Sequence, residues 1–337
     1  MEEVDEEKGG EDSLASVEQG HPSGYSDLEE RALEGVRPPS PLAPLVALAS
    51  HLQNILLSLL SAVHFALLSV LHPLVLLLPS VVRDALASKI FRIGYLLYLT
   101  RVGLWIHKRL VKMSQSSRSH KCTMGERGVY SSCVTFAVPI LFDNLAYILL
   151  DRFSFKAAVV DPSDPLPILR TVNAYNYSIE AALITHRHHD HSGGTGELLK
   201  HFPNMRVIRA QGEPVPHATD SFAEGHEFSV GTMSFRLIVT CGHSYAHASF
   251  VLLSARRCAI EEAECCFTGD ALFNGGIGAL FHGGASSAVA SMDKLSALPD
   301  RAEIYPGHEY SVSTLNFANW LEPTKTCVRI CIEQLCF

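Results

Sequence analysis

The chain has 337 residues, of which 47% are hydrophobic, and a formal net charge of -8. This length allows one large or two ordinary domains, and the acidic balance disfavours non-specific binding to nucleic acid. Nine cysteines occur without a Cys-x-x-Cys pair, which indicates a reducing compartment rather than a disulfide framework.

Residues 1–40 are acidic and poor in apolar clusters. They carry twelve Asp and Glu side chains against three basic ones, and they are rich in Gly, Pro and Ser. Such a composition cannot bury enough apolar surface to offset the cost of ordering, so it predicts a disordered acidic tail. The chain does not begin with a basic stretch and a short apolar core, so we expect no cleaved secretory signal.

Residues 41–82 are expected to form a transmembrane segment. No charged residue lies between Arg37 and Arg83, and the apolar run over residues 52–78 exceeds the ~20 residues that a spanning helix needs. We therefore expect a single-pass membrane protein that contacts the membrane through residues 52–78. Basic residues follow the run and acidic ones precede it, which predicts that the C-terminal domain faces the cytoplasm.

Residues 83–127 are expected to form a basic juxtamembrane and interfacial segment followed by a linker. Residues 90–111 mix apolar, aromatic and basic side chains, which is typical of an amphipathic helix at a membrane surface. A second, weaker span over the same residues is the alternative, and it would reverse the topology.

A pattern of short strands and helices begins near Cys133. Strands are expected over residues 137–141, 145–150, 157–160, 181–184, 206–208, 235–239 and 249–253, with a turn at Asp143–Asn144 and helices over residues 166–175 and 196–202. Strands interleaved with helices predict a layered α/β domain, placed at residues 133–323. Residues 324–337 are expected to be a truncated C-terminal tail.

Four histidines and one carboxylate stand within residues 186–191, directly after the apolar run of residues 181–184. A short loop at the end of a buried strand cannot bury so many imidazoles unpaired, but it can direct them at a common point. The pattern His-x-His-x-Asp-His offers ligand types that suit zinc or iron. Its ligand-type residues are His186, His188, Asp190 and His191.

Three later motifs each place one more ligand-type residue beside a glycine turn. They are Cys241-Gly242-His243, Thr268-Gly269-Asp270 and Pro306-Gly307-His308. Each motif is weak alone, but their order and spacing after the histidine-rich loop indicate one metal centre.

Together these motifs resemble the metallo-β-lactamase superfamily, and specifically its glyoxalase II branch of hydroxyacylglutathione hydrolases, from about residue 140 to residue 323. Residues 89–95 and 160–165 also resemble a membrane-associated member of that branch. The resemblance implies an αββα four-layer sandwich, here preceded by a membrane-spanning helix and a disordered N-terminal tail.

The same resemblance implies a site for two divalent metals, with zinc expected and iron or manganese as alternatives. One metal would be held by His186, His188 and His243. The other would be held by Asp190, His191 and His308. Asp270 would bridge them, and Asp190 and Asp270 are the expected catalytic carboxylates. A hydroxide shared by the two cations would then attack a glutathione thioester such as S-D-lactoylglutathione, releasing D-lactate and glutathione.

Other residues near these motifs have expected supporting roles. Asp161 at a strand end would either accept the ring N–H of a ligating histidine or cap the turn before Pro162. His247 resembles a structural histidine outside the metal shell, and His189 is expected to pack against the site. Cys241 is expected to be a buried, unreactive thiol, and a redox-sensitive thiol close to His243 is the alternative.

The glutathione-binding positions match less well than the metal ligands. Tyr310 matches a tyrosine that follows the last ligand in glyoxalase II. A cation and another tyrosine of that branch are replaced by Ala279 and Phe281. Tyr310 and Phe281 are the expected substrate-contacting residues, and the partner is a glutathione-conjugated small molecule.

Two other functions remain open at this point. One is a mononuclear iron sulfur dioxygenase that acts on glutathione persulfide, with two histidines and Asp270 as ligands. The other is a membrane-anchored regulatory protein with weak or lost catalysis. Metal content and thioester turnover distinguish the three.

Overall fold

The computed structural model describes residues 125–254 and 262–335, together with single residues between 79 and 109. The chain divides into two compact units, Met1–Ser88 and Lys89–Phe337, and the fold below belongs to the second. The expected acidic tail lies outside the described residues, and so does nearly all of the expected transmembrane and juxtamembrane sequence. None of the helices in the described parts combines the length and apolarity that a bilayer crossing needs.

Seven strands form the first sheet in sequence order. They are β1 (Gly125–Val129), β2 (Cys133–Ile140), β3 (Asn144–Asp151), β4 (Lys156–Val160), β5 (Ser178–Leu183), β6 (Arg206–Ala210) and β7 (Asp220–Phe222). Strands β1 to β4 pair antiparallel and β4 to β7 pair parallel. Every residue of β3 is buried, as expected for a central strand covered on both faces.

Five strands form the second sheet, in the order β12-β11-β10-β9-β8. They are β8 (Glu227–Val230), β9 (Met233–Val239), β10 (Ala248–Leu253), β11 (Ala263–Gly269) and β12 (Glu303–Pro306). Only the β11–β12 pair in this order is parallel. Both sheets are therefore mixed.

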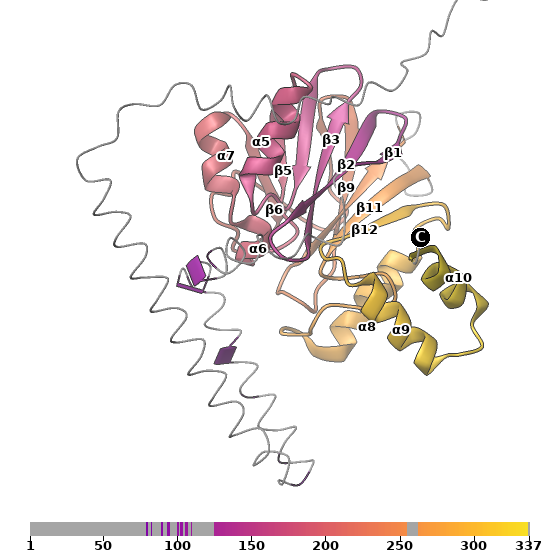
Figure 1. Ribbon diagram of the computed structural model, residues 1–337. Helices are drawn as coiled ribbons and strands as arrows, with labels where there is room; N and C mark the ends of the chain where they lie inside the picture. The colour runs from indigo at the N-terminus through magenta and orange to yellow at the C-terminus, as the bar shows by residue number, and fades with distance from the viewer. Residues whose placement is uncertain are drawn as a thin grey trace, which may run out of the picture. The chain divides into compact units, whose positions relative to one another are not determined.

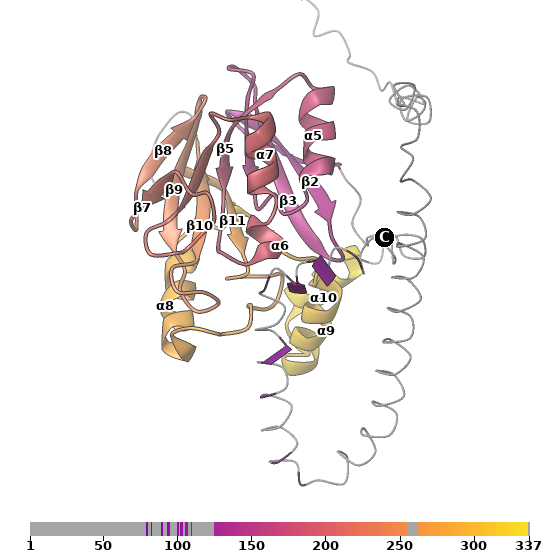
Figure 2. The same cartoon turned by 90° about the vertical axis from the view of Figure 1, so that its left-hand side faces the viewer.

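Helices cover the outer faces of the two sheets (Figures 1 and 2). Helices α5 (Pro165–Ala174) and α7 (Thr195–His201) pack on the first sheet through Ile168 and Leu198. Helix α8 (Gly284–Ser296) packs on the second sheet through Leu295. The remaining helices are α6 (His189–Ser192), α9 (Ser311–Leu321) and α10 (Thr326–Leu335). The expected α/β sandwich with helices outside both sheets is thus observed.

The main core lies between the sheets. Leu149 of the first sheet and Phe235 and Phe250 of the second are fully buried there. Burying one such side chain stabilises the fold by roughly 1.5 to 3 kcal/mol. This core fixes the two sheets face to face, so that the loops at their edge meet.

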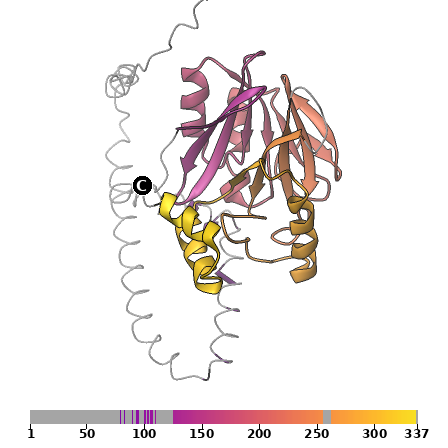
Figure 3. The same ribbon diagram turned by 90° about the vertical axis from the view of Figure 1, so that its right-hand side faces the viewer.

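Strands β7, β8 and β12 and helices α6, α8 and α9 are additional to the elements expected from the sequence, and two further segments differ from the expectations. Strand β1 lies partly in the predicted linker and precedes the predicted domain start at Cys133. It contains Gly125 and Gly128 and pairs with β2 through a register shift, so it has no alternating pattern that would mark it as a strand. The predicted C-terminal tail contains α10, which packs against α9, as Figure 3 shows.

Candidate metal centre

The predicted ligands stand where strands end at one edge of the sandwich. Asp161 follows β4, and His186 and His188 follow the neighbouring parallel strand β5. Asp270 follows β11, and His308 follows its parallel neighbour β12. The carboxyl ends of parallel neighbours meet at the same edge, so each pair of strands delivers its polar residues together.

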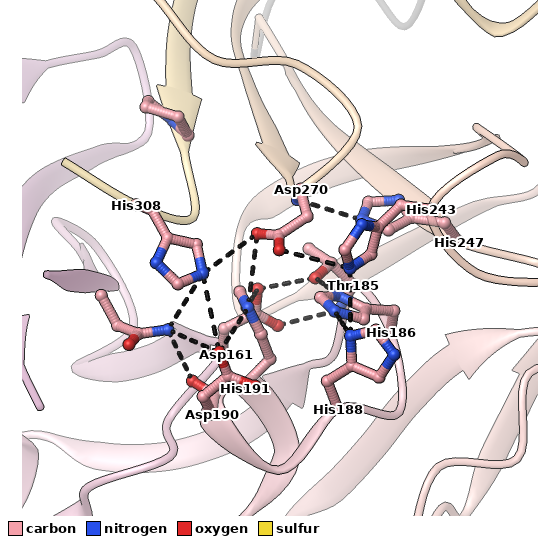
Figure 4. Close-up of polar contacts among 12 residues, drawn as sticks. Asp161, Thr185, His186, His188, Asp190, His191, His243, His247, Asp270 and His308 are labelled. Atoms are coloured by element: carbon pink, nitrogen blue, oxygen red, sulfur yellow. Dashed lines mark hydrogen bonds and ion pairs between the residues drawn. The ribbon is translucent and has the colours of Figure 1, made fainter. Parts of the chain in front are cut away.

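Three histidines form the first cluster (Figure 4). Nδ1 of His188 lies 2.8 Å from Nε2 of His186 and 3.0 Å from Nε2 of His243, which lies between β9 and β10. The other ring nitrogen of His186 lies 3.0 Å from Thr185 Oγ1, and that of His243 donates to the carbonyl of Ala279 at 3.0 Å. These outer contacts turn the inner nitrogens toward a common point.

Asp190, His191 and His308 form the second cluster. Oδ2 of Asp190 lies 3.7 Å from Nε2 of His191 and 3.6 Å from Nε2 of His308. Asp190 and His191 belong to α6, a single turn that follows the first two histidines, and all three side chains are buried.

Asp270 lies between the two clusters (Figure 4). Its Oδ2 is 3.3 Å from Nε2 of His243, while its Oδ1 is 3.3 Å from Nε2 of His191 and 3.5 Å from Nε2 of His308. One carboxylate therefore reaches both groups. All seven predicted ligands are brought together.

The donor set fits two cations. Among the described residues, three buried atoms at the centre have no hydrogen-bond partner: Oδ1 of Asp190, Nε2 of His191 and Oδ1 of Asp270. Leaving buried polar atoms unpaired costs about 1 to 3 kcal/mol each, and a metal ion would remove that cost. Imidazole and carboxylate together suit zinc, iron or manganese, so the clusters are consistent with a dinuclear metal site.

The first cluster holds neutral imidazoles. Burial lowers the pKa of His186 well below its usual value, and the nearby His191 lowers it further. Burial and the neighbouring His243 lower the pKa of His188 to about 2. Neutral rings keep the lone pairs that metal binding requires.

In the second cluster, neighbouring carboxylates outweigh the effect of burial on the pKa of a histidine. Burial alone would lower the pKa of His191, but Asp270 and Asp190 raise it to about 9. Burial would likewise raise the pKa of Asp270, yet His308 and His191 hold it well below its usual range. The carboxylate is therefore ionised, and metal binding here would release protons from the imidazoles.

Asp161 supports both the histidine loop and a ligand-type histidine. Its Oδ1 accepts the backbone N–H of Thr185 at 2.8 Å, and its Oδ2 accepts the Thr185 hydroxyl at 2.7 Å. Oδ2 also accepts Nδ1–H of His191 at 2.9 Å. Of the two roles expected for Asp161, the contact with an imidazole is the one that the geometry provides.

The turn at Asp143–Asn144 contributes two residues that the sequence marked only as a turn. Oδ1 of Asp143 lies 3.0 Å from Nδ1 of His308. The buried Asn144 amide donates to the backbone oxygen and Oδ2 of Asp190, both at 3.2 Å, and lies 3.3 Å from Nε2 of His308. Both residues hold the second cluster from the side of β3.

Glu213 is a second addition to the site's support. It is fully buried, and its two carboxylate oxygens accept the backbone N–H groups of Arg187 at 3.1 Å and Ala246 at 2.9 Å. Arg187 lies between the ligands His186 and His188, while Ala246 follows His243 closely in the chain. Glu213 thus ties together the two loops of the first cluster.

A cavity of about 620 Å³ opens over both clusters, and the predicted substrate-contacting residues line it. The ring of Phe281 lies 5.3 Å from that of His243. The ring of Tyr310 stacks on that of His308 at 4.8 Å, and burial raises its hydroxyl pKa above the usual value. Ala279 lines the same cavity.

Three residues kept outside the metal shell are placed as follows. Nε2 of His247 accepts the backbone N–H of Asp270 at 3.2 Å, so this histidine orients a ligand-type residue. His189 is buried on α6. The Cys241 thiol is half-buried rather than buried; its pKa is raised, chiefly by burial, and it donates to the carbonyl of Tyr245.

The chain is similar in sequence to one protein family and to several known proteins. Residues 156–308 match the family model of the metallo-beta-lactamase superfamily. A hydroxyacylglutathione hydrolase of Aliivibrio fischeri is 35% identical over 187 residues, which cover 56% of this chain and 70% of the relative. One from Alkalilimnicola ehrlichii is 38% identical over 189 residues, with the same coverage. A solved metallo-beta-lactamase structure from Staphylococcus aureus is 21% identical, with a TM-score of 0.46, over 65% of this chain and 67% of that chain.

The protein is an α/β sandwich with two mixed sheets between helices. At one edge of the sandwich, two clusters of His and Asp side chains are consistent with a dinuclear metal site. The chain belongs to the metallo-beta-lactamase superfamily, and within it the chain is similar to hydroxyacylglutathione hydrolases.

Proposed function

We propose that this chain is a metal-dependent hydrolase of thioesters. Asp270, whose carboxylate oxygens reach both clusters, is the observation that carries the proposal. Two divalent cations held there would activate a water molecule and polarise the carbonyl under attack. His186, His188 and His243 would hold one cation, and Asp190, His191 and His308 would hold the other.

The protein's own residues have separate tasks in this reaction. Asp270 would hold both cations in place, because each of its two carboxylate oxygens reaches one cluster. Its negative charge would offset the mutual repulsion of the cations. Asp161 and Asp143 would fix the ring orientations of His191 and His308 through the outer ring nitrogens. Phe281 and Tyr310 would contact the substrate from the cavity wall.

The relatives' names support a glutathione thioester as substrate, with S-D-lactoylglutathione as the first candidate. The complete second cluster favours a binuclear hydrolase over a mononuclear iron dioxygenase, which needs only two histidines and one carboxylate.

We further propose that the chain is a membrane-associated member of this branch, anchored through residues 52–78 with its sandwich domain facing the cytoplasm. The uncharged run in the sequence and the basic residues after it support this proposal.

The test is hydrolysis of S-D-lactoylglutathione by the full-length chain after metal removal and after metal is restored, with Asp270→Ala beside it. Turnover that requires metal and is lost in the variant supports the proposal. Oxygen consumption with glutathione persulfide and a single iron would favour the dioxygenase. Metal binding without turnover of any thioester would favour a regulatory protein.

A further inference from the structure

The walls of the cavity above the metal clusters are apolar. Phe142, Phe273, Ile277, Ala279 and Phe281 line it. The side chains of Phe142 and Ile277 are 42% and 46% exposed, although large apolar groups usually avoid water. An apolar rim around a polar floor is typical of a site whose ligand brings its own apolar part.

Apart from the cations that the clusters would hold, the described residues that line the cavity do not favour a glutathione group. That group carries two carboxylates, which are usually bound by Arg or Lys. Among the described residues that line the cavity, none is Lys or Arg. The carboxylate of Asp143 is 44% exposed there and would repel a ligand carboxylate.

Arg187 precedes His188, which lines the cavity, but the side chain of Arg187 contacts other residues. Its guanidinium lies 3.2 Å from Nε2 of His282 and 5.6 Å from the ring centre of Tyr245, which stacks on His282. Arg187 is not among the residues that line the cavity over the clusters.

We propose that the cavity selects thioesters with a neutral aliphatic acyl chain over S-D-lactoylglutathione. This inference rests on the proposed function. Water adds to the carbonyl carbon and the C–S bond breaks. The products are the carboxylic acid and the thiol, and the sulfur takes the proton that the water loses. The apolar wall holds the chain, while the clusters hold the carbonyl end.

Turnover of four matched thioesters by the metal-loaded full-length chain tests the proposal. They are the hexanoyl and D-lactoyl thioesters of N-acetylcysteamine, which is neutral, and of glutathione. We expect kcat/KM for hexanoyl to exceed that for lactoyl by at least about tenfold on either thiol, because each buried methylene contributes about fourfold. Faster turnover of S-D-lactoylglutathione than of the hexanoyl N-acetylcysteamine thioester would overturn the inference.

Binding of two non-hydrolysable thioethers separates this inference from the proposed function. S-hexyl-N-acetylcysteamine should bind the metal-loaded chain at least as tightly as S-hexylglutathione, as measured by calorimetry. Tighter binding of the glutathione thioether by tenfold or more would overturn the inference whether or not any thioester is hydrolysed. If no thioester is hydrolysed but the two thioethers bind in the expected order, only the hydrolase proposal would be overturned.

Ala279→Lys, compared with Ala297→Lys, tests the role of charge. Both alanines are exposed, but Ala279 lines the cavity, while Ala297 follows α8 and does not. A lysine at position 279 should shift the preference between the two thioethers about tenfold toward glutathione, whereas one at position 297 should not. Equal shifts in the two variants would contradict the assignment.

Discussion

Nδ1 of His191 lies 2.9 Å from Oδ2 of Asp161, and both side chains are buried. The same carboxylate holds Thr185, the residue before His186. A single side chain at the end of β4 therefore orients a ligand-type residue of the second cluster and the loop that carries the first.

Asp161→Asn should weaken metal binding by about 10- to 100-fold, the usual effect of removing a partner behind a ligating histidine. Asparagine suits the test because position 161 has φ 49°, which asparagine tolerates. Competition with a chelator measures the affinity. The control is Asp164→Asn, which alters only the cap of α5. Equal affinities for Asp161→Asn and wild type would contradict the assigned role.

Glu213→Gln should lower the free energy of unfolding by about 1 to 3 kcal/mol, because one buried backbone N–H would face an amide NH₂ instead of an oxygen. Urea unfolding of the metal-free chain gives this value. The exposed carboxylate of Glu224 pairs with Lys294 and accepts the backbone N–H of Val239, so Glu224→Gln should cost about 1 kcal/mol or less because both contacts are exposed to water. Losses of the same size in the two variants would show that Glu213 does not hold the loops.

Gly307→Ala should disrupt the second cluster. A methyl group there would lie 2.7 Å from Oδ1 of Asp270 and 2.8 Å from Cε1 of His191, both closer than real contacts allow. We expect fewer bound metal ions per chain, measured by elemental analysis. Gly125→Ala meets nothing within 4 Å and should retain the wild-type metal content. Full metal content in Gly307→Ala would contradict this geometry.

His247 should make the free energy of unfolding depend on pH. Burial, followed by the influence of His243, lowers its pKa to about 3, whereas the unfolded chain has a histidine pKa of about 6.5. Between these values only the unfolded state takes up the proton. The contribution is therefore complete above about pH 6.5 and is lost as the pH falls toward 3.

His247→Gln tests this assignment, because glutamine offers an oxygen to the Asp270 N–H but takes up no proton. The slope of unfolding free energy against pH, measured by urea unfolding between about pH 4 and 6, should decrease by about 1.4 kcal/mol per pH unit. An unchanged slope would show that a group other than His247 takes up the proton on unfolding.

The sequence was sufficient to identify the residues that the structure brings together, because their pattern is local. Four of the seven stand in one short loop after a buried strand, and the other three each follow a strand or loop marked by glycine. The helix expected over residues 166–175 is α5, and the strand expected over residues 145–150 lies within β3. The hydrophobic pattern was sufficient there because the buried residues of α5 recur at helical spacing and those of β3 form one continuous run.

The supporting contacts could not be predicted in the same way. Glu213 holds backbone groups that lie 26 and 33 residues away in the chain, and Asn144 reaches residues 46 and 164 positions away. Strand order within the first sheet brings Glu213 close to Arg187 and Asn144 close to Asp190, whereas the packing of the two sheets brings them to Ala246 and His308. Strand β1 was missed because its place in the sheet depends on pairing with β2 and not on its own sequence.

The number of metal ions held by the intact chain tests the central claim most directly. Elemental analysis of the full-length protein should find two metal ions per chain in the wild type, and one each in His243→Ala and His308→Ala, with folding checked by circular dichroism. A wild-type chain with a single metal ion that His308→Ala retains would contradict the binuclear centre.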